Sequence, residues 1–274
     1  MRKRVVFVAV FLAVIPVLFS GCETVPLTGR EQFLLVRDSE MAALGAQNFQ
    51  EVKQTEPVST DPQVNMLVRE VGARIARATE QYLVAQGRQP NFQWEFIVIQ
   101  ADDVVNAWCM PGGKVAVYTG ILPVTQTADG LAVVVAHEIA HAVARHSAER
   151  MSQALLIEMG GAALSAALQS RPERTRDLFL QSAGLATTYG VVLPFSRDME
   201  YEADRIGLNL MAMAGYDPRA AVPFWERMNA QSGGGRVPEF LSTHPAPQNR
   251  IAAIQQMMPE AMQYYQRSGA AGAR

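Results

Sequence analysis

The sequence has little cysteine and almost no net charge. Two cysteines in 274 residues rule out a small domain held together by several disulfides. The 24 basic and 26 acidic side chains nearly cancel and give a formal net charge of -2. The protein therefore lacks the positive charge that would attract nucleic acid, and no nucleic-acid partner is expected. No repeat with a period of about 20 to 50 residues recurs, which excludes an appended repeat module. The remaining composition, 49% hydrophobic and 18% charged, is typical of a globular protein and allows one large domain.

An uncharged, apolar run follows three basic residues at the N-terminus. It extends from Val5 to Phe19 and ends in Ser20-Gly21-Cys22. A basic start, a short apolar stretch and small residues before a cysteine are typical of a lipoprotein signal peptide. We therefore expect residues 1–21 to be removed, and Cys22 to carry a lipid that attaches the protein to a membrane.

The mature chain is then expected to begin with a lipidated tether over residues 22–30, followed by one domain over residues 31–274. The alternative is a retained inner-membrane anchor, although the fifteen residues from Val5 to Phe19 fall short of the roughly 20 that span a bilayer. With Cys22 lipidated, Cys109 has no intramolecular partner. It is most simply a small apolar residue.

The patterning predicts an α+β fold that is mainly helical. Apolar residues at helical spacing predict helices over Ser39–Lys53 and Pro62–Thr79, and alternation predicts a strand over Gln93–Gln100. The turn signal Pro111-Gly112-Gly113 predicts a small antiparallel sheet, and the chain beyond Asp129 is expected to be helical. Two apolar stretches, Ala154–Leu168 and Ser182–Leu193, are too short to span a membrane and predict close helix packing, with contact to a membrane surface as the alternative.

The motif His-Glu-x-x-His lies in an apolar helical stretch. His137 and His141 are four residues apart, so their imidazoles lie about 40° apart on one helix face. Two such nitrogens can hold one Zn²⁺, and Glu138 can accept a proton from a water that acts as the nucleophile.

A catalytic zinc site needs a third protein ligand. Glu200 and Asp204 are four residues apart on a second helical stretch, so the first can ligate while the second accepts a hydrogen bond from a ligand imidazole. His146 lies about 180° from His137 around the helix and is therefore expected to point away, on the helix surface near Arg145 and Glu149. Glu202 is expected to face away from the metal.

At this point the sequence resembles the zinc endopeptidases that include HtpX, the CAAX prenyl endopeptidase and the Oma-type protease. His137–His141, Ser196–Asp204, Asn106–Gly113 and Leu241–Pro245 carry the resemblance. It is strongest to the periplasmic lipoproteins LoiP and BepA, without the tetratricopeptide domain of BepA.

The resemblance implies a gluzincin-type domain with one Zn²⁺ per chain and a small sheet beside the active-site helix. It implies that His137, His141 and Glu200 ligate the metal, that Glu138 is the general base, and that Asp204 supports a ligand. A substrate strand is expected to pair with the sheet edge between Asn106 and Met110.

His244, in a His-Pro step, has two functional readings beside a plain turn. It either donates to the developing oxyanion or occupies the metal's open position as a latch. Arg250 is a weaker candidate for charge stabilisation, and a surface ion pair is an equal alternative.

The leading hypothesis is a zinc metalloendopeptidase that hydrolyses unfolded or misassembled cell-envelope proteins in quality control, at the periplasmic face of the outer membrane. The alternative is a latched or weakly active assembly factor or chaperone for outer-membrane proteins, working with the outer-membrane assembly machinery.

Overall fold

The computed structural model describes residues 22–168, 195–231, 238–244 and 249–269. The predicted signal peptide and the apolar stretch Ser182–Leu193 lie outside these residues. The stretch Ala154–Leu168 falls in a helix, and within the described parts of the chain no helix combines the length and hydropathy needed to cross a membrane.

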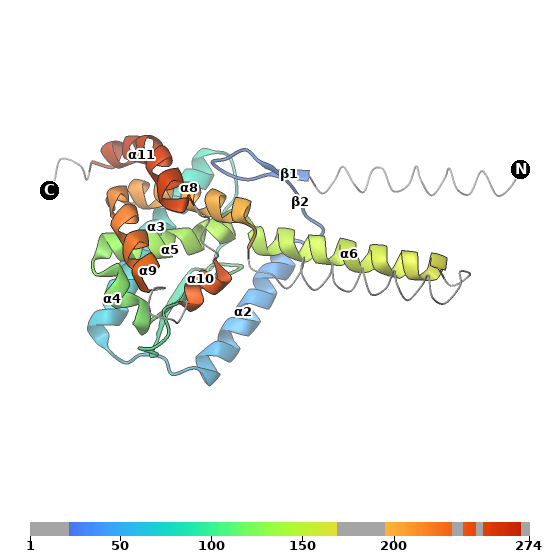
Figure 1. Cartoon of the computed structure of the whole chain (residues 1–274), viewed down its shortest axis with the longest axis horizontal. Helices are drawn as coiled ribbons and strands as arrows, with labels where there is room; N and C mark the ends of the chain where they lie inside the picture. The colour runs from blue at the N-terminus through green and yellow to red at the C-terminus, as the bar shows by residue number, and fades with distance from the viewer. Residues whose placement is uncertain (1–21, 169–194, 232–237, 245–248, 270–274) are drawn as a thin grey trace, which may run out of the picture. The chain divides into compact units, whose positions relative to one another are not determined.

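The described residues are mostly helical, as the patterning predicts (Figure 1). The longer helices are α2 (Asp38–Thr55), α3 (Pro62–Ala85), α5 (Ala128–Val143), α6 (His146–Leu168), α8 (Arg197–Met213), α9 (Ala221–Gln231) and α11 (Arg250–Arg267). The short ones are α4 (Leu122–Thr125), α10 (Glu239–Thr243) and the 3-10 turns Thr119–Ile121 and Pro218–Ala220. Helix α3 begins as expected, because Asp61 accepts hydrogen bonds from the backbone N–H groups of Gln63 and Val64 and Pro62 follows it.

The chain divides into two compact units, and the smaller one includes the predicted tether. Strands β1 (Cys22–Thr24) and β2 (Glu31–Phe33) pair there as an antiparallel hairpin. Arg30 forms a two-pronged ion pair with Glu149, with N–O distances of 2.9 and 2.7 Å. The residues expected as a tether therefore contain ordered secondary structure.

The larger unit contains a three-stranded sheet, in the order β3-β5-β4. Strands β4 (Ala107–Met110) and β5 (Lys114–Tyr118) are antiparallel around the predicted turn, where Gly112 and Gly113 have φ angles of 84° and 87°. Strand β3 (Glu95–Ile99) pairs parallel to β5. The prediction of an antiparallel sheet is therefore correct for β4 and β5 but incomplete, because β4 runs in the opposite direction to both other strands and leaves β3 and β5 parallel.

Helix α5 is the centre of the larger unit, and every residue from Gly130 to His141 is buried. It packs against α8, α3 and β4, while α11 packs on α8 (Figure 1). Gly207 of α8 lies directly against the backbone of Ala136 and His137 in α5. This close approach brings Glu200 and Asp204 of α8 beside the two histidines of α5.

Candidate metal centre

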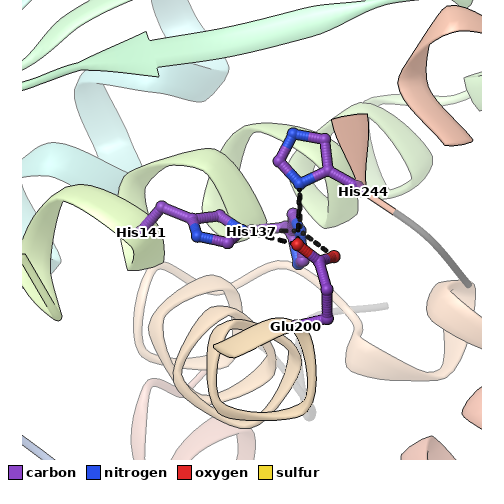
Figure 2. Close-up of side chains that lie close together, drawn as sticks. All are labelled: His137, His141, Glu200 and His244. Carbon is purple, nitrogen blue, oxygen red and sulfur yellow. Dashed lines mark hydrogen bonds and ion pairs between the residues drawn. The ribbon is translucent and has the colours of Figure 1, made fainter. Parts of the chain in front are cut away.

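Four buried side chains converge between α5, α8 and the end of α10. His137, His141, Glu200 and His244 each offer one ligand atom to a group that could hold a metal ion, with these atoms within 4.8 Å of one another. Figure 2 shows the His244 ring approaching from above and the Glu200 carboxylate from below, on either side of His137. The structure thus brings together the three predicted ligands and the predicted latch residue.

The nitrogen atoms that face this centre are Nε2 of His137 and Nε2 of His141, which lie 3.1 Å apart. The carboxylate of Glu200 lies 3.4 Å from the first and 3.5 Å from the second. The Nδ1 atom of His244 lies 3.1 Å from Oε1 of Glu200 and 3.4 Å from Nε2 of His137.

The donor set fits a divalent cation. Asp204 lies 3.1 Å from Nδ1 of His137 and, as a carboxylate, accepts the hydrogen of that nitrogen. In the neutral ring, Nε2 of His137 therefore carries a lone pair directed at the centre. Within the part of the chain that the structure describes, Oε1 of Glu138 is buried without a hydrogen-bond partner. A buried cluster of two imidazoles and a carboxylate is a typical zinc donor set.

Charges around the centre perturb the histidines strongly. Burial of His137 opposes its charged form, but hydrogen bonds to Asp204 and Glu200 outweigh this effect and raise the pKa of His137 to about 9. Burial lowers the pKa of His141 well below its usual value, and the neighbouring His137 adds to this shift. The carboxylates of Asp204 and Glu200 thus favour positive charge at this point, which suits a cation site.

The two glutamates at the centre shift in opposite directions. Burial opposes the charged form of Glu200, but hydrogen bonds from His137 and His244 lower its pKa below the usual value, which keeps it a carboxylate. Burial is the main cause that raises the pKa of Glu138, and a backbone hydrogen bond from Cys109 in β4 opposes the shift. Glu138 is thus placed between the metal centre and the outer strand of the sheet.

Arg250 is part of the buried site and does not form a surface ion pair. Its guanidinium stacks 3.5 Å from the centroid of the Trp225 ring. One amino group donates to Asp204 at 2.7 Å, and the other lies 3.3 Å from Glu200. Arg250 therefore compensates the charge of two buried carboxylates.

The structure corrects the predicted position of His146, which is fully buried. Its Nδ1 atom lies 2.9 Å from Nδ1 of His141, and its Nε2 atom lies 3.0 Å from Glu202. The prediction assumed that the helix continues, but α5 ends at Val143 and Arg145 adopts a left-handed conformation with φ of 59°. The chain reverses there and returns His146 to the site.

Nothing in the sequence marks that turn, because it contains no glycine or proline. Arg145 is held by an ion pair with Asp38, a contact between residues far apart in the sequence. The sequence analysis also did not predict Phe195 as part of the site. Its ring stacks on His141 with centroids 4.1 Å apart, in a position that composition and spacing do not reveal.

The predicted substrate edge lies beside the metal centre. Strand β4 is an outer strand of the sheet and packs against α5. Met110 pairs with Lys114 of β5 at one end of β4. Asn106 directly precedes the strand, and its buried side chain accepts a hydrogen bond from the backbone of Ala107.

Residues 69–258 match the model of a protein family described as Peptidase family M48. The chain belongs to this family.

Three relatives show the range of similarity to M48 metalloendopeptidases. A mitochondrial metalloendopeptidase OMA1 from Schizosaccharomyces pombe is 44% identical over 180 residues, 65% of this chain and 51% of the relative. The OMA1 protein of Saccharomyces cerevisiae is 31% identical over 271 residues, 92% of this chain and 75% of the relative. The β-barrel assembly-enhancing protease of Escherichia coli is 28% identical over 244 residues, 87% of this chain and 48% of the relative. The M48 chain thus spans about half the length of the first and third.

These relatives correct the predicted location. Mitochondrial OMA1 metalloendopeptidases match at 31% to 44% identity, whereas the E. coli protease matches at 28%. The placement at the periplasmic face of the outer membrane is therefore wrong. It relied on a short N-terminal pattern of apolar and small residues, which carries much less information than similarity along the whole domain.

Proposed function

We propose that this M48 chain is a zinc-dependent endopeptidase that hydrolyses peptide bonds in unfolded or misassembled proteins, with Glu138 as the general base. The observation that carries the proposal is the convergence of His137, His141 and Glu200 on one buried point, with Glu138 beside it. His137, His141 and Glu200 would hold the zinc.

A bound zinc ion supplies a Lewis acid that polarises a carbonyl and lowers the pKa of water. The chain itself supplies the proton transfers. Glu138 accepts the proton of the attacking water and delivers it to the leaving nitrogen.

Two further residues, Asp204 and Arg250, hold the metal ligands in position and do not contact the reacting atoms. Asp204 fixes the ring of His137, so that Nε2 faces the centre. Arg250 holds Asp204 and balances its charge, which keeps both groups in place without a direct role at the substrate.

The edge of β4 is the proposed substrate-binding element, over the segment from Asn106 to Met110. An extended peptide that adds to an outer strand forms main-chain hydrogen bonds, which depend little on its side chains. The hydrogen bond between Cys109 and Glu138 supports this assignment, because it ties the same strand to the general base. Unfolded and misassembled chains expose many extended segments of this kind, which supports them as the preferred substrates.

A second candidate function is that of a latched assembly factor. The distance of 3.1 Å between His244 and Glu200 favours it, because a fourth protein ligand would close the position that a substrate needs. The name of the E. coli relative, a β-barrel assembly-enhancing protease, supports a role in the assembly of β-barrel proteins. Attachment to a membrane through a lipid on Cys22 stays part of the proposal, and the mass of the mature N-terminus tests it.

The test compares casein cleavage and metal content of the purified native chain, Glu138→Gln and the matched control Glu226→Gln, whose side chain is exposed on α9. We expect one zinc per chain in all three proteins. Loss of the general base should lower the cleavage rate by about 10²- to 10⁴-fold in Glu138→Gln only. Cleavage by Glu138→Gln at the native rate would overturn the assigned role, and zinc without cleavage in the native chain would favour the assembly factor.

A further inference from the structure

A second series of buried polar contacts starts at the metal-centre residue His141, separate from the contact between His137 and Asp204. It connects His141 to His146 and His146 to Glu202, through contacts of 2.9 and 3.0 Å. His146 is fully buried and Glu202 is 8% exposed. Desolvated polar groups destabilise the fold unless they are hydrogen-bonded, so this arrangement needs a reason.

The positions of the hydrogens follow from the contacts. Nε2 of His141 faces the metal centre, so in the neutral ring the hydrogen lies on Nδ1. Two ring nitrogens 2.9 Å apart must share one hydrogen, because two N–H groups or two lone pairs would repel. Nδ1 of His146 is therefore the acceptor.

The same argument determines the direction of the hydrogen bond between His146 and Glu202. Since Nδ1 of His146 accepts, its hydrogen lies on Nε2, which donates to the carboxylate of Glu202. Glu202 thus accepts a hydrogen bond from Nε2 of His146, and Nδ1 of His146 accepts one from Nδ1 of His141. This leaves the lone pair of His141 on Nε2, which faces the metal centre. Reversal of either hydrogen bond would place a hydrogen on the nitrogen of His141 that the metal requires.

We propose that His146, held by Glu202, is a positioning residue that fixes the ring orientation and the tautomer of the zinc ligand His141. The inference rests on the proposed zinc site. His137 obtains the same support directly from Asp204, at 3.1 Å. His141 obtains it through an interposed neutral imidazole, so that a second carboxylate charge stays one ring further from the centre.

The turn between α5 and α6 fits this role. Arg145 holds a left-handed conformation that side chains other than glycine rarely adopt, and its ion pair with Asp38 anchors it. A continued helix would carry His146 to the opposite face from His137. The strained turn therefore places this one imidazole against His141.

The first test measures zinc affinity of the full chain by competition with a chromophoric chelator at neutral pH. Zinc alone is the probe, so the result does not depend on cleavage. His146→Leu fills the space but removes the acceptor, and we expect its zinc affinity to fall by about 10- to 100-fold. His146→Asn places an amide oxygen near the position of Nδ1 and should recover most of the lost affinity.

A second pair of variants tests the other end. Glu202→Leu removes the acceptor of His146 and should weaken zinc binding, whereas Glu202→Gln retains an acceptor oxygen and should stay near the native affinity. Thermal unfolding of the metal-free proteins accompanies both pairs, and Co²⁺ absorption spectra report ligand geometry. We expect the spectra of His146→Asn, but not of His146→Leu, to match the native spectrum.

The outcomes separate this inference from the proposed function. Native zinc affinity in His146→Leu, or an equal loss in His146→Leu and His146→Asn, would overturn the positioning role while the zinc site stands. A native chain that binds no zinc would overturn the metal site and this inference with it. The positioning role is supported if zinc affinity falls in the variants that lack the acceptor atom and is retained in those that keep it, without a matching change in unfolding temperature.

Discussion

A methyl group on Gly207 would lie 3.0 Å from the backbone nitrogen of His137, and 3.1 Å from the carbonyl group of Ala136. The two helices that carry the metal centre thus meet where α8 has no side chain. Glu200 and Asp204 lie on the same helix, so the distance between the helices sets how closely these carboxylates approach the histidines of α5.

Gly207→Ala should therefore weaken zinc binding and lower the free energy of unfolding. The neighbours are helix backbone, which cannot rotate away. Overpacking costs about 1–3 kcal/mol, which outweighs the gain of up to about 1 kcal/mol from replacing a helical glycine. Denaturant unfolding and zinc competition measure both effects. The matched control is Gly160→Ala on α6, where a methyl group meets none of the described residues within 4 Å and should leave zinc affinity unchanged. Unchanged affinity in Gly207→Ala would show that helix spacing does not control the site.

Arg250→Met should destabilise the metal-free protein by about 3–5 kcal/mol, because it leaves Asp204 and Glu200 buried without their guanidinium. Zinc then supplies the missing positive charge, so zinc should stabilise the variant more than it stabilises the native chain. Unfolding with and without zinc measures the difference. Arg219→Met is the control, since Arg219 pairs with Asp217 at the surface and its loss should change stability by at most about 1 kcal/mol. Equal stabilisation by zinc in native chain and Arg250→Met would contradict this account.

Cys109 should react slowly with iodoacetamide in the folded protein. Cys109 is partly buried, and desolvation raises the pKa of its thiol well above the usual value, with the charge of Glu138 adding to the shift. A raised pKa lowers the thiolate fraction at any given pH, so the rate should stay low at neutral pH and rise about tenfold per pH unit into the alkaline range. Mass spectrometry of the peptide with Cys109 measures this rate, and the urea-unfolded chain provides the reference. A folded rate equal to the unfolded rate at neutral pH would show that the thiol is not shielded.

The sequence predicts the centre of the site well, because local spacing determines it. His137 and His141 share a helix face through the period of the helix alone, and Glu200 and Asp204 do the same on α8. Asp61 and the turn before β5 are equally local signals, since a cap or a glycine pair acts within a few residues.

The features that the sequence does not predict depend on contacts between distant residues. The turn at Arg145 includes an ion pair with the distant residue Asp38, and a helix that continued instead would place His146 on the face opposite His137. The parallel pairing of β3 with β5 likewise joins strands that are not neighbours in the sequence. The sequence around Arg250 does not show whether its side chain is buried or exposed. It is buried because it stacks on Trp225 and donates to Asp204, two residues distant in the sequence.

His244 offers the sharpest test of how the site is restrained. Its Nδ1 atom lies among the ligand atoms, and its Nε2 atom lies 3.4 Å from Glu138, so the ring stands where a substrate carbonyl and water must enter. Stacking against Phe240, with centroids 4.7 Å apart, holds it there. A latch and an oxyanion donor make opposite predictions from this one position.

If His244 is a latch, His244→Ala should cleave casein faster than the native chain at equal zinc content. A latch whose opening costs about 1.4 kcal/mol leaves roughly one tenth of the molecules open, so the gain should reach about tenfold. Zinc affinity should fall at the same time, because one ligand is lost. The neighbouring Thr243→Ala, an exposed substitution on α10, should change neither quantity. A large fall in the cleavage rate of His244→Ala with unchanged zinc affinity would instead assign His244 to the oxyanion, since a donor that acts only in the transition state contributes nothing to holding the metal.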